Sequence, residues 1–169
     1  MNPILSAGLL IGVLCGVWTF VMGLTGWYRD PMLLNLFFVV ILIEIGGLVW
    51  GLRQTAAQGR GYGSQVIAGT MMAIVAGVVV ICSSLLFTTV AYPDYFNELE
   101  ALYIEMLQQQ GLSESEIARQ VSENRAANTP MGQAMQGFIG TLVTGILASA
   151  IIAIWVRSRH PIPGPAATR

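Results

Sequence analysis

Glu44 is the side chain with the clearest chemical potential, because it is the one carboxyl group within a long apolar stretch. That stretch covers residues 31–52, and Glu44 lies eight residues before its end at Leu52. At about 1.5 Å per helical residue, the carboxyl group would lie roughly 12 Å from that end, near the middle of a bilayer. A charge at this depth costs several kcal/mol. We therefore expect Glu44 to be protonated at neutral pH and to face other helices.

Two interpretations of Glu44 remain open. As a proton or ion relay, it would need polar neighbours at similar depth, and Ser149 is one candidate. As a packing residue, it would stay neutral and form a hydrogen bond with Ser149 or with backbone carbonyls near Gly46 and Gly47. The other long apolar stretches contain no Lys, Arg or His that could pair with it.

Motifs of other chemistries are absent from the sequence. Cys15 and Cys82 lie in apolar stretches without metal-ligand spacing, and the single histidine, His160, is in the C-terminal tail. There is no P-loop, G-x-S-x-G, H-E-x-x-H or dinucleotide-binding fingerprint. We therefore expect no catalytic activity, no metal and no cofactor. A chain without lysine and with a net charge of −1 also gives no reason to expect nucleic acid as a partner.

The elements that must position Glu44 are long apolar helices. Charged residues make up only 10% of the chain, whereas a soluble domain has about 25%. Crossing a bilayer takes about 20 apolar residues in a helix. Four stretches qualify: residues 4–26, 31–52, 65–90 and 135–156. The expected fold class is an all-α membrane protein with four transmembrane helices, surrounded by lipid.

Arginine placement predicts the side of the membrane that each loop faces. The loop between the second and third stretches holds Arg53 and Arg60 and no acid, and the C-terminal tail holds three further arginines. The loop between the third and fourth stretches holds seven acids and two arginines. Because basic loops stay in the cytoplasm, we expect both termini there, with the acidic loop outside a bacterial inner membrane.

The acidic loop is expected to form a helical hairpin over residues 94–127. Its apolar side chains recur at helical spacing through Gln110, Gly111 would end the first helix, and Ser113 with Glu116 would open the second. The apolar face would cover the ends of the transmembrane helices or dock a basic partner. The candidate docking residues are Tyr95, Leu99, Tyr103 and Met106.

Small residues at four-residue spacing form stripes on three of the apolar stretches. Such stripes let membrane helices approach closely. They would serve packing within the chain or a homo-oligomer contact. The candidate packing residues are Gly8, Gly12 and Gly16, then Gly69 and Gly77, and finally Gly137 and Gly145.

Several short motifs carry a resemblance to a known family. They are residues 51–53 (Gly-Leu-Arg), 61–63 (Gly-Tyr-Gly), 93–96 (Pro-Asp-Tyr-Phe) and 111–117 (Gly-Leu-Ser-Glu-Ser-Glu-Ile). In their order and spacing the chain resembles a bacterial membrane-protein family catalogued as domain of unknown function 4199. The resemblance covers nearly the whole chain and implies this fold, but it implies no activity.

The sequence therefore predicts a single transmembrane domain over residues 1–156 and a flexible cytoplasmic tail over residues 157–169, which is rich in proline. The expected function is that of a non-catalytic structural or interaction subunit, held with another membrane protein or with further copies of itself. The alternative is a small oligomeric transporter or channel, coupled to protons or ions through Glu44.

Overall fold

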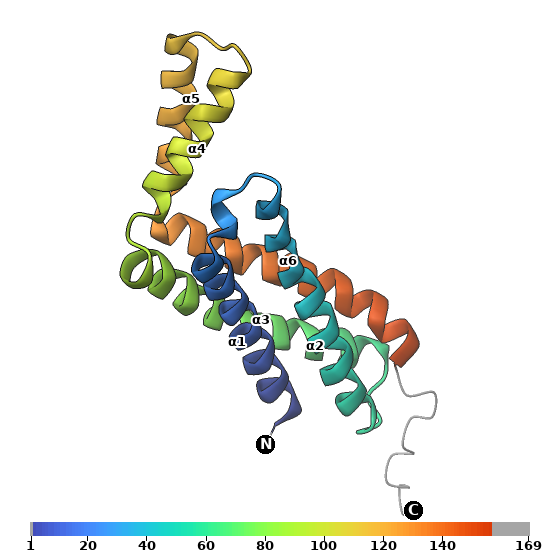
Figure 1. The fold of residues 1–169 in the computed structure, drawn as a ribbon. Coiled ribbons are helices and arrows are strands. Elements are labelled where there is room, and N and C mark those ends of the chain that lie inside the picture. The colour runs from blue at the N-terminus through green and yellow to red at the C-terminus, as the bar shows by residue number, and fades with distance from the viewer. Residues whose placement is uncertain (1, 157–169) are drawn as a thin grey trace, which may run out of the picture.

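The computed structural model describes residues 2–156, and its regular elements are all helical (Figure 1). The tail predicted to be flexible, residues 157–169, lies outside the described residues. The elements are α1 (Pro3–Thr25), η1 (Trp27–Arg29), η2 (Leu33–Phe38), α2 (Val39–Ala56), α3 (Tyr62–Leu86), η3 (Phe87–Ala91), α4 (Tyr95–Gln109), α5 (Glu114–Ala127) and α6 (Pro130–Val156).

Four helices are long and apolar enough to cross a membrane: Pro3–Thr25, Leu33–Ala56, Tyr62–Ala91 and Pro130–Val156. They match the four predicted stretches, with clear differences at two ends. The second helix runs to Ala56, four residues beyond the predicted end at Leu52, and the last helix starts earlier than predicted. This helix begins at Pro130 rather than near Met135. Proline is favoured in a first helical turn, where its missing N–H is not needed. The Thr129 hydroxyl also accepts a hydrogen bond from the Gly132 amide (3.0 Å).

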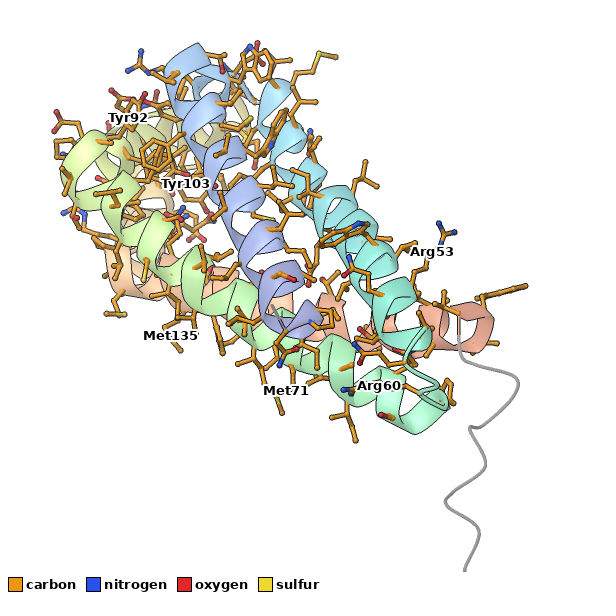
Figure 2. All side chains as sticks on the ribbon, turned by 90° about the horizontal axis from the view of Figure 1, so that it is seen from below. Arg53, Arg60, Met71, Tyr92, Tyr103 and Met135 are labelled. Atoms are coloured by element: carbon orange, nitrogen blue, oxygen red, sulfur yellow. The ribbon has the colours of Figure 1, made fainter. Side chains whose placement is uncertain are left out.

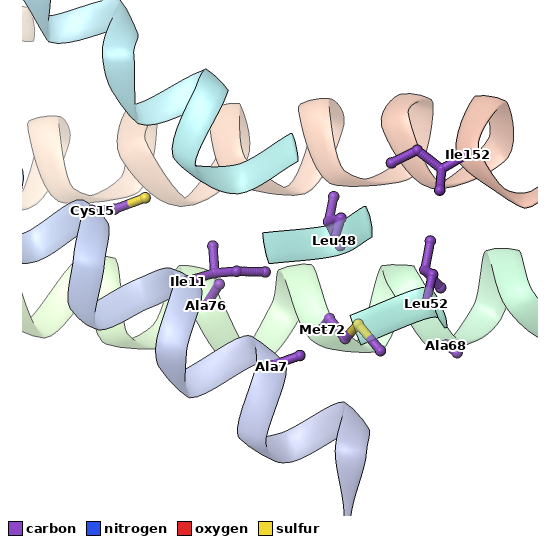
Figure 3. Close-up of a cluster of buried hydrophobic side chains, with 9 residues drawn as sticks. All are labelled: Ala7, Ile11, Cys15, Leu48, Leu52, Ala68, Met72, Ala76 and Ile152. Carbon is purple, nitrogen blue, oxygen red and sulfur yellow. The ribbon is translucent and has the colours of Figure 1, made fainter. Parts of the chain in front are cut away.

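The four long helices pack around a shared apolar core. Helix α3 contacts α1, α2 and α6, and α2 also contacts α1 and α6. Figure 3 shows Ile11, Leu48, Leu52 and Met72 converging from α1, α2 and α3, with Ile152 of α6 beside them. The outward faces are apolar too, and Trp155 is 82% exposed. Apolar side chains gather on both the inside and the outside, which suits a lipid surrounding.

Glycines on these helices let side chains of a neighbouring helix pack directly against the backbone. On α1, a Cβ added at Gly8 or Gly12 would lie 2.6 Å from the Cβ of Val75 or Val79 of α3. All seven glycines predicted to support packing face such contacts within the chain. Gly8, Gly12 and Gly16 face α3, Gly69 and Gly77 face α6, and Gly137 and Gly145 of α6 face α3. The stripes are therefore occupied by contacts within a single copy.

Helices α4 and α5 lie side by side and extend away from the four long helices (Figure 1). We call residues 95–127 the α4–α5 pair. Gly111 has a φ of +74°, the left-handed conformation that favours glycine, in the turn between the two helices. Ser113 accepts the Glu116 amide at the start of α5 (3.4 Å). Asp94 precedes α4, but its side chain makes no capping hydrogen bond.

Candidate functional site

Glu44 projects from α2 into the contact between α3 and α6. It is 3% exposed. Its Oε1 lies 3.0 Å from the place where a Cβ at Gly145 would stand, and that Cβ would also lie 2.3 Å from the Cβ of Ala73. The missing side chain at Gly145 thus makes room for the carboxyl group between three helices. Glu44 therefore faces the interior of the helix bundle. This agrees with the high free-energy cost of exposing a carboxyl group to lipid.

Ser149 lies one helical turn after Gly145 on α6 and is fully buried. Its Oγ faces Gly69 of α3, where an added Cβ would be only 1.9 Å away. No hydrogen bond joins Ser149 to Glu44. Within the described residues, Glu44 Oε1 and Ser149 Oγ are the buried side-chain oxygens or nitrogens that lack a hydrogen-bond partner. Unpartnered buried polar atoms are rare in folded proteins and require an explanation.

A buried pair that the sequence analysis missed lies closer to the end of the helices that carries Arg53 and Arg60. Thr55 and Gln65 are both 0% exposed. The Thr55 hydroxyl donates to Gln65 Oε1 (2.6 Å), and Gln65 Nε2 donates to the Leu52 carbonyl (3.3 Å). Gln65 is four residues before Gly69 on α3, so it continues the four-residue spacing of the small packing residues. A polar residue at this spacing was the feature of the sequence that could have revealed the buried pair.

The cysteines and acids do not form a metal centre in the part of the chain that the structure describes. Cys15 is buried on α1, and its Sγ donates weakly to the carbonyl of Val40 (3.8 Å), one turn from Glu44 on α2. Cys82 is exposed on α3. Both cysteines are therefore free thiols within or beside the helix contacts.

A groove of about 410 Å³ lies between the α4–α5 pair and the segment that follows α1. We call it the outer groove. The surface that lines it is mainly apolar, with Glu100 and Arg125 among the polar lining residues. These two form an ion pair that joins α4 to α5. Leu99, Tyr103 and Met106 also line the groove, and Met106 is 43% exposed.

Tyr95 does not belong to this docking surface, contrary to the sequence prediction. It is 8% exposed and packs into an aromatic cluster with Tyr28 and Phe87, with ring centroids 5.2 Å from each. Tyr92 stacks on Phe87 at 4.6 Å. The helical spacing of α4 placed Tyr95 on an apolar face, but the segment after α1 covers that part of the face.

A charged network reinforces this junction. Glu98 of α4 accepts hydrogen bonds from the Arg29 guanidinium (2.9 and 2.8 Å) and from the Tyr28 hydroxyl. These donors, Arg29 first, hold the pKa of Glu98 below its usual range. Arg29 and Glu98 remain partly exposed, so water screens the pair and it adds little to stability. The aromatic cluster and this network together fix one wall of the outer groove.

The geometry defines a class: a helical protein whose four long apolar helices carry a helical pair beyond one end. A family model described as a protein of unknown function (DUF4199) matches residues 6–158. The chain belongs to that family, which confirms the resemblance drawn from its short motifs. Neither a curated protein nor a solved structure matches the chain.

Proposed function

We propose that this chain is a non-catalytic integral membrane protein that serves as an interaction subunit, with the outer groove as its docking surface. The observation that carries the proposal is the groove itself. It is a mainly apolar hollow of about 410 Å³ beyond the long helices, with one wall fixed by the aromatic cluster and the Arg29–Glu98 network. A concave apolar surface with a few polar groups is the usual form of a recognition site.

Membrane integration is supported by the length and apolar character of the four long helices. Arg53 and Arg60 lie at the end away from the α4–α5 pair (Figure 2). By the positive-inside rule, we propose that the arginine end lies in the cytoplasm and that the outer groove lies on the opposite side of a bacterial inner membrane.

The charge of the α4–α5 region indicates what kind of partner fits. Residues 94–127 hold seven acids and two arginines, a formal charge of 2 − 7 = −5. Asp94, Glu105 and Glu114 form no ion pair among the described residues. We propose a segment of a second membrane protein whose apolar residues enter the groove and whose Lys or Arg residues meet these acids.

The test is the composition of complexes drawn from the native membrane into lipid nanodiscs, measured by intact mass. Met106→Asp places a charge in the groove, while Ala101→Asp places the same charge on an exposed position outside its lining. A second chain in fixed ratio, lost with Met106→Asp and kept with Ala101→Asp, supports the proposal. Complexes that contain only copies of this chain contradict it.

A second candidate function is a small oligomeric transporter or channel, coupled to protons or ions. The observation that favours it is the buried Oε1 of Glu44, which lacks a partner at the contact of three helices. Proton and ion pathways use such acids. Glu44→Gln separates the two candidates, because flux in proteoliposomes should collapse only if the carboxyl group carries it.

A further inference from the structure

The buried polar groups of the long helices follow one another along a single face of α3. Gln65, Gly69 and Ala73 are spaced four residues apart, about 6 Å per step. Gln65 bonds Thr55, Gly69 faces Ser149, and Ala73 lies against Gly145, where Glu44 Oε1 is found. A row of polar groups thus leads from the arginine end of the helices to Glu44.

The same face becomes apolar beyond Glu44, towards the α4–α5 pair. The next α3 position at this spacing is Gly77, and the ring of Phe138 of α6 lies against it (an added Cβ would be 2.6 Å from Cδ2). One turn further along the helices, Gly137 faces Val80.

Of the fully buried polar side chains among the described residues, Ser149, Thr55 and Gln65 lie on the arginine side of Glu44. On the other side, α6 carries the half-buried Thr141 one turn before Gly145, and the next fully buried polar residue is Thr88. The row of buried polar groups therefore extends mainly towards the arginine end.

The tight contact around Glu44 decides which ligand it suits. A cation such as Ca²⁺ or Mg²⁺ takes six or more oxygen ligands, and the side-chain oxygens here belong to Glu44 and Ser149. A Cβ at Gly145 would already collide with Ala73. A proton occupies no such volume. The facing elements add one titratable group, Cys15 of α1, while residues 130–156 of α6 contain none.

We propose that Glu44 is a proton-binding site that exchanges its proton with water only at the arginine end, along Ser149 and the Thr55–Gln65 pair. Ser149, Thr55 and Gln65 are positioning residues, because they offer hydrogen bonds to water that enters between the helices. The proposal uses the site of the second candidate function but requires no passage across the membrane. The proposal can therefore be correct even if the protein transports nothing.

The experiment uses dicyclohexylcarbodiimide, an apolar reagent that reacts with protonated carboxyl groups. The carboxyl proton moves to one carbodiimide nitrogen as the carboxylate oxygen bonds the central carbon, and acyl transfer to nitrogen then leaves a stable N-acylurea. The protein is placed in proteoliposomes, and cleavage of the exposed α4–α5 pair by added protease reports its orientation. The adduct on Glu44 is quantified by mass spectrometry, with the pH set separately on each side.

We expect labelling of Glu44 to fall about tenfold per pH unit at the arginine end once the carboxyl group is mainly ionised. It should not respond to pH at the end with the α4–α5 pair. A response to that side, or to both sides, overturns the inference, and a response to both supports the transport candidate instead. Labelling that ignores pH on both sides also overturns it, as does an undiminished adduct in Glu44→Gln.

The positioning residues are tested by the rate of response after a pH jump. Gln65→Leu should slow the change in labelling by roughly tenfold, equivalent to about 1.4 kcal/mol on the barrier, and leave its final extent unchanged. Thr70→Val is the matched control, because Thr70 bonds only Val66 within its own helix (2.9 Å). Equal rates in the two variants would remove the Thr55–Gln65 pair from the path. The sidedness measured with the unaltered chain tests the site even where a variant fails to fold.

Discussion

Ser149 Oγ occupies the space in which a side chain at Gly69 would begin, because an added Cβ would lie 1.9 Å from it. The contact joins α3 to α6 at a point where both residues are buried. Gly69→Ala should therefore force the helices apart and lower stability by about 1–3 kcal/mol. Gly140→Ala is the control, since an added Cβ there meets nothing within 4 Å. Unfolding in mixed micelles measures both, and equal stability of the two variants would contradict the packing argument.

The protonation state of Glu44 gives a second prediction. A buried carboxylate with no hydrogen-bond partner or ion pair would be very costly, so the group should be neutral at pH 6. Infrared difference spectra of the unaltered chain and Glu44→Gln should then show loss of a carboxylic-acid C=O band. Loss of carboxylate bands at that pH would contradict the prediction. Stability of Glu44→Gln should stay within about 1 kcal/mol of the unaltered chain, because a neutral amide replaces a neutral acid.

The junction between α1 and α4 should weaken in acid. Folding lowers the pKa of Glu98 through Arg29 and Tyr28. The stabilisation is therefore complete above the ordinary pKa of a glutamate, and it is lost as the pH falls below that value and through the lowered one. The protection of α4 amides, relative to their intrinsic exchange rate at each pH, should fall over this range in the unaltered chain. Glu98→Gln should remove that dependence, while Glu105→Gln, which breaks no ion pair, should retain it.

Phe87 is the centre of the aromatic cluster, at 1% exposure, and its removal should release the α4–α5 pair. We expect Phe87→Ala to cost about 3–5 kcal/mol. The loss should appear as faster hydrogen exchange in α4 and α5, with the contacts between α3 and α6 retained. Phe38→Ala is the control at a ring that is 64% exposed. Unchanged exchange in α4 would show that the cluster does not hold the pair.

The Thr55–Gln65 hydrogen bond should couple the ends of α2 and α3. A double-mutant cycle with Thr55→Val and Gln65→Leu should give a coupling free energy of about 0.6 kcal/mol, typical of bonds between membrane helices. Pairing Gln65→Leu with Thr70→Val should give none, because Thr70 bonds within α3. Additive effects in the first cycle would mean that the hydrogen bond is not formed in the folded chain.

Local patterns predicted the elements well, because length, apolar character and glycine spacing act along one helix. They identified the four long helices and the glycines at their contacts, and they placed Gly111 at a helix end. Contacts between segments distant in sequence were harder to predict. Tyr95 lies on an apolar face, but only the fold shows that Tyr28 covers it. Gln65 has the spacing of a packing residue, but its partner Thr55 lies on another helix.

The burial of Glu44 depends on α6, because Gly145 supplies the room for its carboxyl group. Helix α6 is also the last of the described helices to leave the ribosome. During synthesis, residues 45–129 are therefore complete before the helix that covers Glu44 begins. Until α6 is made, the carboxyl group of Glu44 lacks the cover that Gly145 and its neighbours give it in the folded chain. Helix α6 thus converts an exposed acid of the growing chain into an internal one.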